Sequence, residues 1–371
     1  MTRKRVCILT FHNSRNYGAV LQAYALQKKM GEIFEIVEIL DYRNEKIEHE
    51  LRLWTCKDFT IKEFVRAIFA LIFRLHKKIA FEKYMHGYMK ISKRVQREDL
   101  LMSSLPYDIF VTGSDQVWNT VLTGNDETFF LDFVEQDKCK IAFAASFGDG
   151  QAVIDNRKEC LLRKFQLITL REDKACKIVE EALGESIKVC CDPTLLLESV
   201  KWKEVAACRL KRNKYVFLFM IDDSRQLIEY TRKLAKEKGM CIVSNKRCLS
   251  FLRHISPRDF VSWVLYADYV VTNSFHGTVF SLLFEKRFVS HRFTEEGKPK
   301  VRIMELLDKV SLGHRVTDNA GLDIDVQEDW DAVGHKLSQM RLESWRFMSD
   351  WFEQNVGGNE NGGENQGVAI S

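Results

Sequence analysis

The chain has 371 residues, of which 46% are hydrophobic and 29% are charged. This length is too great for one small core and predicts two domains of ordinary size. The net charge is only +4, from 56 basic and 52 acidic residues, which argues against a protein that coats nucleic acid. No run of roughly 18 apolar residues occurs, so a membrane-spanning helix is not expected.

The ten cysteines are scattered along the chain, and none belongs to a CxxC pair. Several lie inside apolar runs, such as Cys7 and Cys241, where a free thiol behaves as a small hydrophobic side chain. The spacing typical of zinc ligands is missing, and a disulfide framework is not expected in a chain of this length. We therefore expect a cytoplasmic protein without a metal site, whose N-terminal segment is a strand and not a signal peptide.

Strand-like and helix-like segments alternate along the N-terminal half. The predicted strands, which are short, apolar and rich in Val, Ile and Phe, are residues 6–11, 34–42, 107–113, 140–146, 165–170 and 188–192. Helices are predicted over 20–30, ending at Gly31, and over the long stretch 61–85. This alternation is typical of a mostly parallel sheet with helices on both faces.

A second unit with the same alternation begins near Trp202. Its predicted strands are 214–222, 240–245, 267–274 and 287–293, and its predicted helices are 225–239, 257–266 and 276–284. The fold class is therefore α/β, with two Rossmann-like doubly wound domains facing a cleft. The predicted division is an N-terminal domain, a C-terminal domain, a closing helix and a disordered tail, at 1–200, 201–335, 336–355 and 356–371.

Ligands of open α/β sheets bind beyond the carboxyl ends of the strands, so polar residues at these positions are candidates for a site. The first such turn holds Arg15, Asn16 and Gly18 ahead of a helix. A helix N-terminus presents free N–H groups to an anion, and glycine allows close approach of the backbone. The spacing matches neither a Walker loop nor a full dinucleotide-binding fingerprint, so an ordinary strand-to-helix turn is the alternative.

A second turn follows the strand at 107–113 and contains Gly113, Ser114, Asp115 and Trp118. Asp115 is a candidate for a general acid or for a contact to a sugar hydroxyl, and Trp118 is a candidate for stacking on a sugar ring. The alternative is that Ser114 or Asp115 caps a helix and that Trp118 packs in the core.

Arg171 lies at the exit of the strand at 165–170, where its planar guanidinium could bind a carboxylate or a phosphate. The alternative is a structural ion pair with Glu172, Asp173 or Asp192. We interpret Asp192, which precedes a proline, as part of a rigid turn that leads to the second domain.

The strongest candidate is the segment TNSFHGTVF, which places His276 between a strand and a helix. The positive end of the helix disfavours imidazolium and favours a neutral ring that can act as a base. A purely structural histidine is the alternative. The polar or small neighbours that we include as substrate-binding candidates are Asn273, Ser274, Gly277 and Thr278.

Several ordered motifs, NYGAVLQAYAL, DIFVTGSDQVWN, LRED, CDPTLLL and ADYVVTNSFHGTVFSLLFEKRFV, resemble the polysaccharide pyruvyl transferase family over residues 5–315. The resemblance implies an architecture similar to the two-domain GT-B glycosyltransferases. It also implies transfer of the pyruvyl group of phosphoenolpyruvate to a pair of hydroxyls on a nucleotide- or lipid-linked sugar. The product would be a ketal on a surface glycan such as capsule or exopolysaccharide, made without a metal or dissociable cofactor.

The resemblance also assigns roles to individual residues. His276 matches the family's acid/base histidine, Arg171 an arginine that holds the donor, and Arg302 a recurrent arginine ahead of a leucine pair. Members of the family often carry Arg-Leu-His where this chain has Ser274 and Phe275 before the histidine. Either another cation, Arg171, Arg302 or Arg15, replaces the missing arginine, or the donor differs.

In the mechanism that we expect, His276 deprotonates a sugar hydroxyl and Asp115 supplies the proton to the donor's methylene carbon. Two other functions fit the same cleft. One is a glycosyltransferase that uses a nucleotide sugar, and the other is a glycan-binding relative without catalytic activity.

The stretch 61–85 supports a separate hypothesis of peripheral contact with a membrane. It is apolar over much of its surface and carries a series of basic residues, Lys62, Arg66, Arg74, Lys77 and Lys78. Helices of this kind can lie on an anionic bilayer, here the inner face of the cytoplasmic membrane. The alternative is a helix that packs on the sheet and has a basic outer face.

Overall fold

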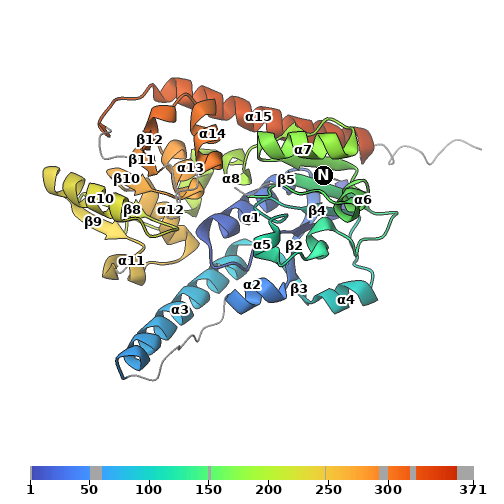
Figure 1. Ribbon diagram of the computed structural model, residues 1–371, viewed down its shortest axis with the longest axis horizontal. Helices are drawn as coiled ribbons and strands as arrows, with labels where there is room; N and C mark the ends of the chain where they lie inside the picture. Colours follow the sequence, from blue (N-terminus) through green and yellow to red (C-terminus); the bar gives the residue numbers. More distant parts are fainter. Residues whose placement is uncertain are drawn as a thin grey trace, which may run out of the picture.

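The computed structural model describes residues 2–50, 61–148, 152–246, 248–291, 300–317 and 323–356. These residues form two parallel β-sheets, each flanked by helices, that lie next to one another in the molecule (Figure 1). The long helix α3 extends away from the body, and the last helix, α15, crosses from the second sheet back to the first.

The first sheet has seven strands in the order β3-β2-β1-β4-β5-β6-β7, and all neighbours pair in parallel. The strands are β1 Thr2–Leu9, β2 Phe34–Tyr42, β3 Ile91–Val95, β4 Ile109–Thr112, β5 Cys139–Ala145, β6 Leu167–Leu170 and β7 Lys188–Val189. Sequence reasoning missed β3. This strand lies at the edge of the sheet and has no fully buried residue, so it lacks the apolar run that marks its neighbours.

The second sheet has five strands in the order β12-β11-β10-β8-β9, again all parallel. They are β8 Tyr215–Phe219, β9 Cys241–Ser244, β10 Tyr269–Thr272, β11 Arg287–His291 and β12 Val316–Thr317. β8 and β10 are buried along their whole length, as expected for central strands covered on both faces. The predicted fold class, two Rossmann-like domains of parallel α/β structure, is confirmed.

The helices that cover the two sheets are α1 Tyr17–Met30, α2 Glu45–Glu50, α3 Ile61–Tyr88, α4 Arg97–Met102, α5 Thr120–Thr123, α6 Asn156–Leu162, α7 Asp173–Leu183, α8 Pro193–Leu196, α9 Ser199–Val205, α10 Arg225–Glu237, α11 Leu249–Arg253, α12 Pro257–Leu265, α13 Phe275–Leu283, α14 Val301–Lys309 and α15 Trp330–Asn355. Two short 3₁₀ helices are η1 Glu127–Phe130 and η2 Gly313–Arg315. None of the described helices is long and apolar enough to cross a bilayer.

The two domains share one apolar core where α1 meets α12. The ring of Tyr17 stacks on Phe260 with centroids 5.0 Å apart, and its hydroxyl donates to the carbonyl of Ile255 over 2.9 Å. Nearby, the ring of Trp202 packs against that of Tyr24 in α1, with centroids 5.8 Å apart. Because these contacts join the N-terminal domain to the C-terminal one, they hold the facing strand ends in a defined arrangement.

α15 ties the end of the chain to the first domain. The backbone N–H of Cys191 donates to the hydroxyl of Ser344 over 3.0 Å, and Phe352 packs edge-on against Phe34 at 4.8 Å. The helix begins at Trp330, earlier than the predicted start at residue 336. The predicted tail, apart from Val356, lies outside the described residues.

Candidate functional site

A cavity of about 220 Å³ lies between the carboxyl ends of strands from both sheets. Its walls come from the N-terminus of α1, the turn after β4, the turns after β8 and β10, and the start of α14. The lining residues are Asn16, Asp115, Gln116, Ile221, Asp222, Asn273, Ser274, Phe275, His276, Lys300, Arg302 and Ile303. Both candidates for acid/base chemistry, His276 and Asp115, thus reach one cavity, where parallel sheets commonly bind ligands.

His276 lies in the first turn of α13, whose N-cap is Ser274. Its Nε2 is 3.4 Å from the Oδ2 atom of Asp192, and the side chain is 11% exposed. The other side of the ring lies against α1, because a Cβ atom added at Gly18 would be only 1.9 Å from Nδ1. Although His276 belongs to the C-terminal domain, two groups of the N-terminal domain therefore hold its ring.

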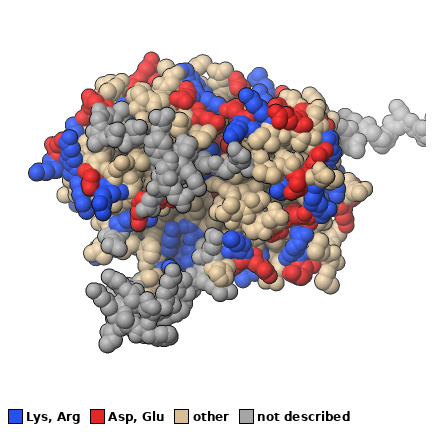
Figure 2. Space-filling view, in the orientation of Figure 1, with Lys and Arg blue, Asp and Glu red and all other residues tan. Residues whose placement is uncertain are grey.

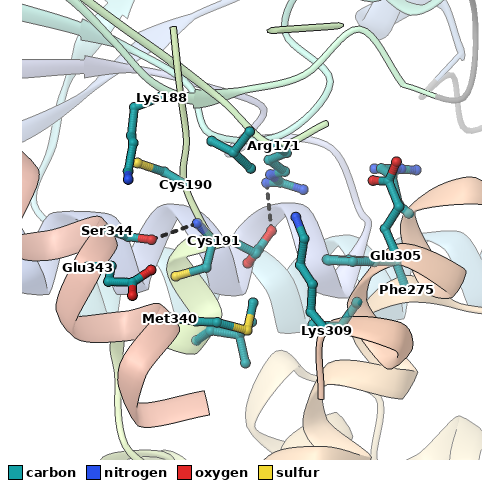
Figure 3. A pocket seen from close by; sticks show the side chains of 15 residues that line it. Arg171, Lys188, Cys190, Cys191, Phe275, Glu305, Lys309, Met340, Glu343 and Ser344 are labelled. Atoms are coloured by element: carbon teal, nitrogen blue, oxygen red, sulfur yellow. Dashed lines mark hydrogen bonds and ion pairs between the residues drawn. The ribbon is translucent and has the colours of Figure 1, made fainter. Parts of the chain in front are cut away.

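Asp192 is the N-cap of α8, and its carboxylate is fully buried. Oδ1 accepts a hydrogen bond from the backbone N–H of Thr194 over 2.8 Å, and Oδ2 lies 2.7 Å from Nη2 of Arg171 (Figure 3). The Arg171 pair has the distance of an ion pair, although its orientation does not meet the geometry of a hydrogen bond. Burial alone would raise the pKa of Asp192, but the charges of Arg171 and His276 outweigh it and hold that pKa well below its usual range.

Arg171 connects this carboxylate to the turn after β4. Its Nε donates to the hydroxyl of Ser114 over 2.8 Å, and its Nη1 lies 4.0 Å from the carboxylate of Asp115. Ser114 is fully buried and donates to the carbonyl of Ala144 over 2.6 Å. Gly113, with a φ of 103°, is required in this turn because a Cβ atom would lie 2.5 Å from the carbonyl oxygen of Phe143. Two turns that sequence reasoning treated separately thus form one buried polar network.

Trp118 does not contribute to this site, which corrects the predicted stacking on a sugar. The ring is 1% exposed, stacks on Phe130 at 5.1 Å and donates to the carbonyl of Phe129 over 3.0 Å. It belongs to the core of the first domain, where a ligand has no access.

The polar residues around His276 mainly shape the backbone. Asn273 accepts from the N–H of Ile221 and donates to the carbonyl of Asp222, both over 2.8 Å, so it fixes the neighbouring turn. Thr278 is fully buried and bonds to the hydroxyl of Ser290 at 2.7 Å. Gly277 faces Thr272, whose hydroxyl oxygen would be 2.4 Å from an added Cβ atom. The buried Thr278 and Gly277 therefore serve the packing of α13, which corrects their assignment as direct substrate contacts.

Two cations enter the cavity from the start of α14. Lys300 is 11% exposed and forms an ion pair of 2.7 Å with Asp222, and Arg302 lies 5.6 Å above the ring of Phe275. Sequence reasoning named Arg302 but missed Lys300. It named Asp192 as an alternative ion-pair partner of Arg171, which the structure shows, but not as a neighbour of His276. Arg15 lines a separate cavity of about 250 Å³, together with His12, so it is not a lining residue of this site.

A larger cavity, of about 410 Å³, adjoins the site across Phe275 and Arg302 (Figure 3). The ring of Phe275 has the guanidinium of Arg171 5.9 Å from its centroid, in addition to that of Arg302. Lys309 of α14 extends into this space, and Glu343 and Ser344 of α15 face it from the other side. Within the described ranges, no cluster of side chains could hold a metal ion.

Comparison with known proteins shows the family to which this chain belongs. A family model described as polysaccharide pyruvyl transferase matches residues 16–290, which include Asp115, Arg171, Asp192 and His276 but not α14. No curated protein matches the chain.

Similar solved structures include two epimerases and a heptosyltransferase, all of low sequence identity. A putative UDP-N-acetylglucosamine 2-epimerase from Listeria monocytogenes is 11% identical, with a TM-score of 0.44 and coverage of 100% of both chains. The UDP-GlcNAc 2-epimerase from Neisseria meningitidis bound to UDP-GlcNAc is 8% identical, with a TM-score of 0.47 and coverage of 95% of this chain and 100% of the other. An E. coli heptosyltransferase with ADP is 11% identical, with a TM-score of 0.35 and coverage of 91% and 99%. At this level of similarity, the likeness says nothing about the substrate of this chain.

Proposed function

We propose that this chain, which belongs to the polysaccharide pyruvyl transferase family, transfers the pyruvyl group of phosphoenolpyruvate to two hydroxyls of a nucleotide- or lipid-linked sugar. The product is a ketal made during surface-glycan biosynthesis in the cytoplasm. One observation carries the proposal: a buried Arg171–Asp192–His276 network connects the two domains beside a cavity that also holds cations. Such a network suits a base that acts on a neutral hydroxyl next to an anionic donor.

The carboxylate and the phosphate of the donor both require cations. Lys300 and Arg302 line the cavity, and Arg171 lines the larger cavity next to it. We assign to Lys300 and Arg302 the role that an arginine directly before the Leu-His pair has in other members, since Ser274 occupies that position here. Arg15, which lines another cavity, has no part in this assignment.

His276 is the base in this mechanism. His276, which lines the cavity, takes the proton of the first sugar hydroxyl as the oxygen of that hydroxyl bonds to C2 of the donor. The ionised carboxylate of Asp192 stabilises the imidazolium that forms. Asp115, which lines the same cavity, gives a proton to the methylene carbon and turns it into a methyl group.

The second half of the reaction closes the ketal. The C2–O bond to phosphate breaks, and phosphate leaves with the proton held by His276. The second hydroxyl then bonds to C2, and its proton returns to Asp115. The net change is one phosphoenolpyruvate and two hydroxyls converted to one ketal and one hydrogen phosphate, with no oxidation or reduction.

The test is phosphate release from phosphoenolpyruvate with a panel of nucleotide- and lipid-linked sugars, for the wild type and for His276→Ala. We expect release that depends on the acceptor and is lost in the variant. Tight binding of a nucleotide sugar, together with transfer of its glycosyl group and no release from phosphoenolpyruvate, would contradict the proposal and favour a glycosyltransferase. Acceptor binding without turnover of either donor would favour a non-catalytic glycan-binding protein.

A further inference from the structure

α3 carries apolar side chains on its exposed face in addition to those that it buries against the body of the protein, among them Phe81, Tyr84 and Met85. Its exposed face carries Ile68, Ile72, Leu75 and Ile79, whose exposed fractions are 37%, 58%, 37% and 60%. The spacing of four, three and four residues places these side chains in one stripe along the helix. Surface helices normally turn such a stripe toward the core, so this stripe requires an explanation.

The opposite side of α3 faces the body of the protein and carries positive charge. The ammonium group of Lys77 lies 4.9 Å from the ring centroid of Tyr17 and 5.3 Å from that of Phe81. Burial and the nearby charges of Arg15 and Lys246 lower the pKa of Lys77 to about 8. Figure 2 shows Lys and Arg side chains gathered in a hollow of the molecule near α3. Cations also flank the exposed stripe, because Lys78, whose side chain is 44% exposed, follows Leu75 by three residues and the exposed Lys83 follows Ile79 by four.

The charge of the helix favours one occupant of this stripe over another. Residues 61–85 contain six Lys or Arg and two Asp or Glu, so two copies of α3 would repel each other. The stripe is also small: its exposed area is on the order of a few hundred Å², and two such patches fall below the ~1,200 Å² of a stable interface. An anionic bilayer supplies both an apolar layer and the opposite charge.

We propose that α3 is an interfacial membrane helix, which places the stripe Ile68–Ile72–Leu75–Ile79 in the outer layer of an anionic bilayer. The helix lies along the surface, because no described helix is apolar enough to cross it. This proposal goes beyond the reaction and does not depend on its chemistry.

The test is flotation of the full chain with vesicles of equimolar phosphatidylglycerol and phosphatidylcholine, compared with vesicles of phosphatidylcholine alone. The variant Ile72→Gln/Ile79→Gln removes the two most exposed side chains of the stripe. Its control is Val121→Gln/Leu342→Gln, which replaces two apolar side chains that are 75% and 61% exposed elsewhere. We expect the wild type and the control to float with the anionic vesicles, and binding of the stripe variant to fall about tenfold or more.

Equal flotation of the stripe variant and the wild type would overturn the proposal, as would no flotation of the wild type. Equal binding to phosphatidylcholine alone would contradict the role of charge. Light scattering provides a further arm: a wild-type dimer that the stripe variant dissociates would assign the stripe to a second copy of the chain. Phosphate release with a water-soluble acceptor should be the same in the stripe variant and the wild type, which separates this proposal from the proposed reaction.

Discussion

The two domains hold their parts of the site in different ways. On the N-terminal side, Arg171 and Asp192 are almost completely buried and are fixed by each other and by Ser114. On the C-terminal side, Lys300 pairs with Asp222, whose side chain is 38% exposed. A buried network is rigid but intolerant of the loss of one partner, whereas a solvated pair can rearrange. We therefore expect Arg171 and Asp192 to fix the geometry of the catalytic residues. Lys300, in contrast, binds the donor and can adjust its position.

The largest effect on kcat is expected at His276, which belongs to the C-terminal domain and contacts Asp192 of the N-terminal one. His276→Gln should lower kcat by about 10²–10⁴-fold, because the base is lost while a polar side chain of similar size remains. Acceptor-dependent phosphate release measures the rate, and circular dichroism checks the fold. Full activity in a folded variant would remove His276 from the mechanism.

The buried Arg171–Asp192 pair and the more exposed Lys300–Asp222 pair can be compared by replacing the carboxylate of each with an amide. Asp192→Asn keeps the cap of α8 but leaves Arg171 buried without its charge partner, so we expect a loss of about 3–5 kcal/mol in the free energy of unfolding. Asp222→Asn should cost less, about 1 kcal/mol, since the carboxylate of Asp222 is 38% exposed and water already screens the pair. Urea denaturation measures both values, and equal losses would show that the two sides are held alike.

The close approach of α1 to the histidine ring provides a steric test. Gly18→Ala places a methyl group against Nδ1 of His276, so we expect kcat to fall about tenfold or more and stability to fall by about 1–3 kcal/mol. Gly87→Ala is the control, because no atom lies within 4 Å of a Cβ atom added there. If Gly18→Ala and Gly87→Ala behave alike in activity and in urea denaturation, α1 does not position the ring.

The smallest effect is expected on the C-terminal side. Lys300→Met should raise the KM for phosphoenolpyruvate by about tenfold with little change in kcat, because it removes a cation used for binding in both the ground state and the transition state. Lys309→Met, at a lysine that pairs with Asp173 outside the smaller cavity, is the control and should leave KM unchanged. A change confined to kcat would show that Lys300 acts in the chemical step and not in donor binding. It would contradict the proposed difference between the N-terminal and C-terminal groups of the site.

Much of the fold was predictable because buried parallel strands form continuous apolar runs. β8 and β10 are examples, since every residue in them is buried. β3 was not predictable in this way, because an edge strand can carry the polar sequence ISKRV without burying it. The start of α15 was also placed too late, since the helix begins at Trp330 and is capped by Asp329.

The site was predictable only where a polar residue directly follows a strand. That rule brought His276 and Asp115 to one cavity, but it also selected Trp118, because sequence does not distinguish a core indole from an exposed one. Lys300 was missed since its partner, Asp222, lies far away in the chain and nothing in the local pattern marks it. Asp192 has a local signal, a carboxylate at a strand exit ahead of a proline, but its contact with His276 exists only in the folded chain.

The fate of the donor's methylene carbon in heavy water tests the proposed pyruvyl transfer most sharply. The enzyme would be incubated in heavy water with phosphoenolpyruvate labelled at that carbon and with an accepted sugar, and the purified product would be examined by NMR and mass spectrometry. If pyruvyl transfer proceeds as proposed, the product contains a labelled methyl group that carries one solvent deuterium, in a ketal joined to two sugar oxygens, and no such product forms with His276→Ala. A product that contains a transferred sugar and no labelled carbon, or a labelled methylene that gains no deuterium, would contradict it.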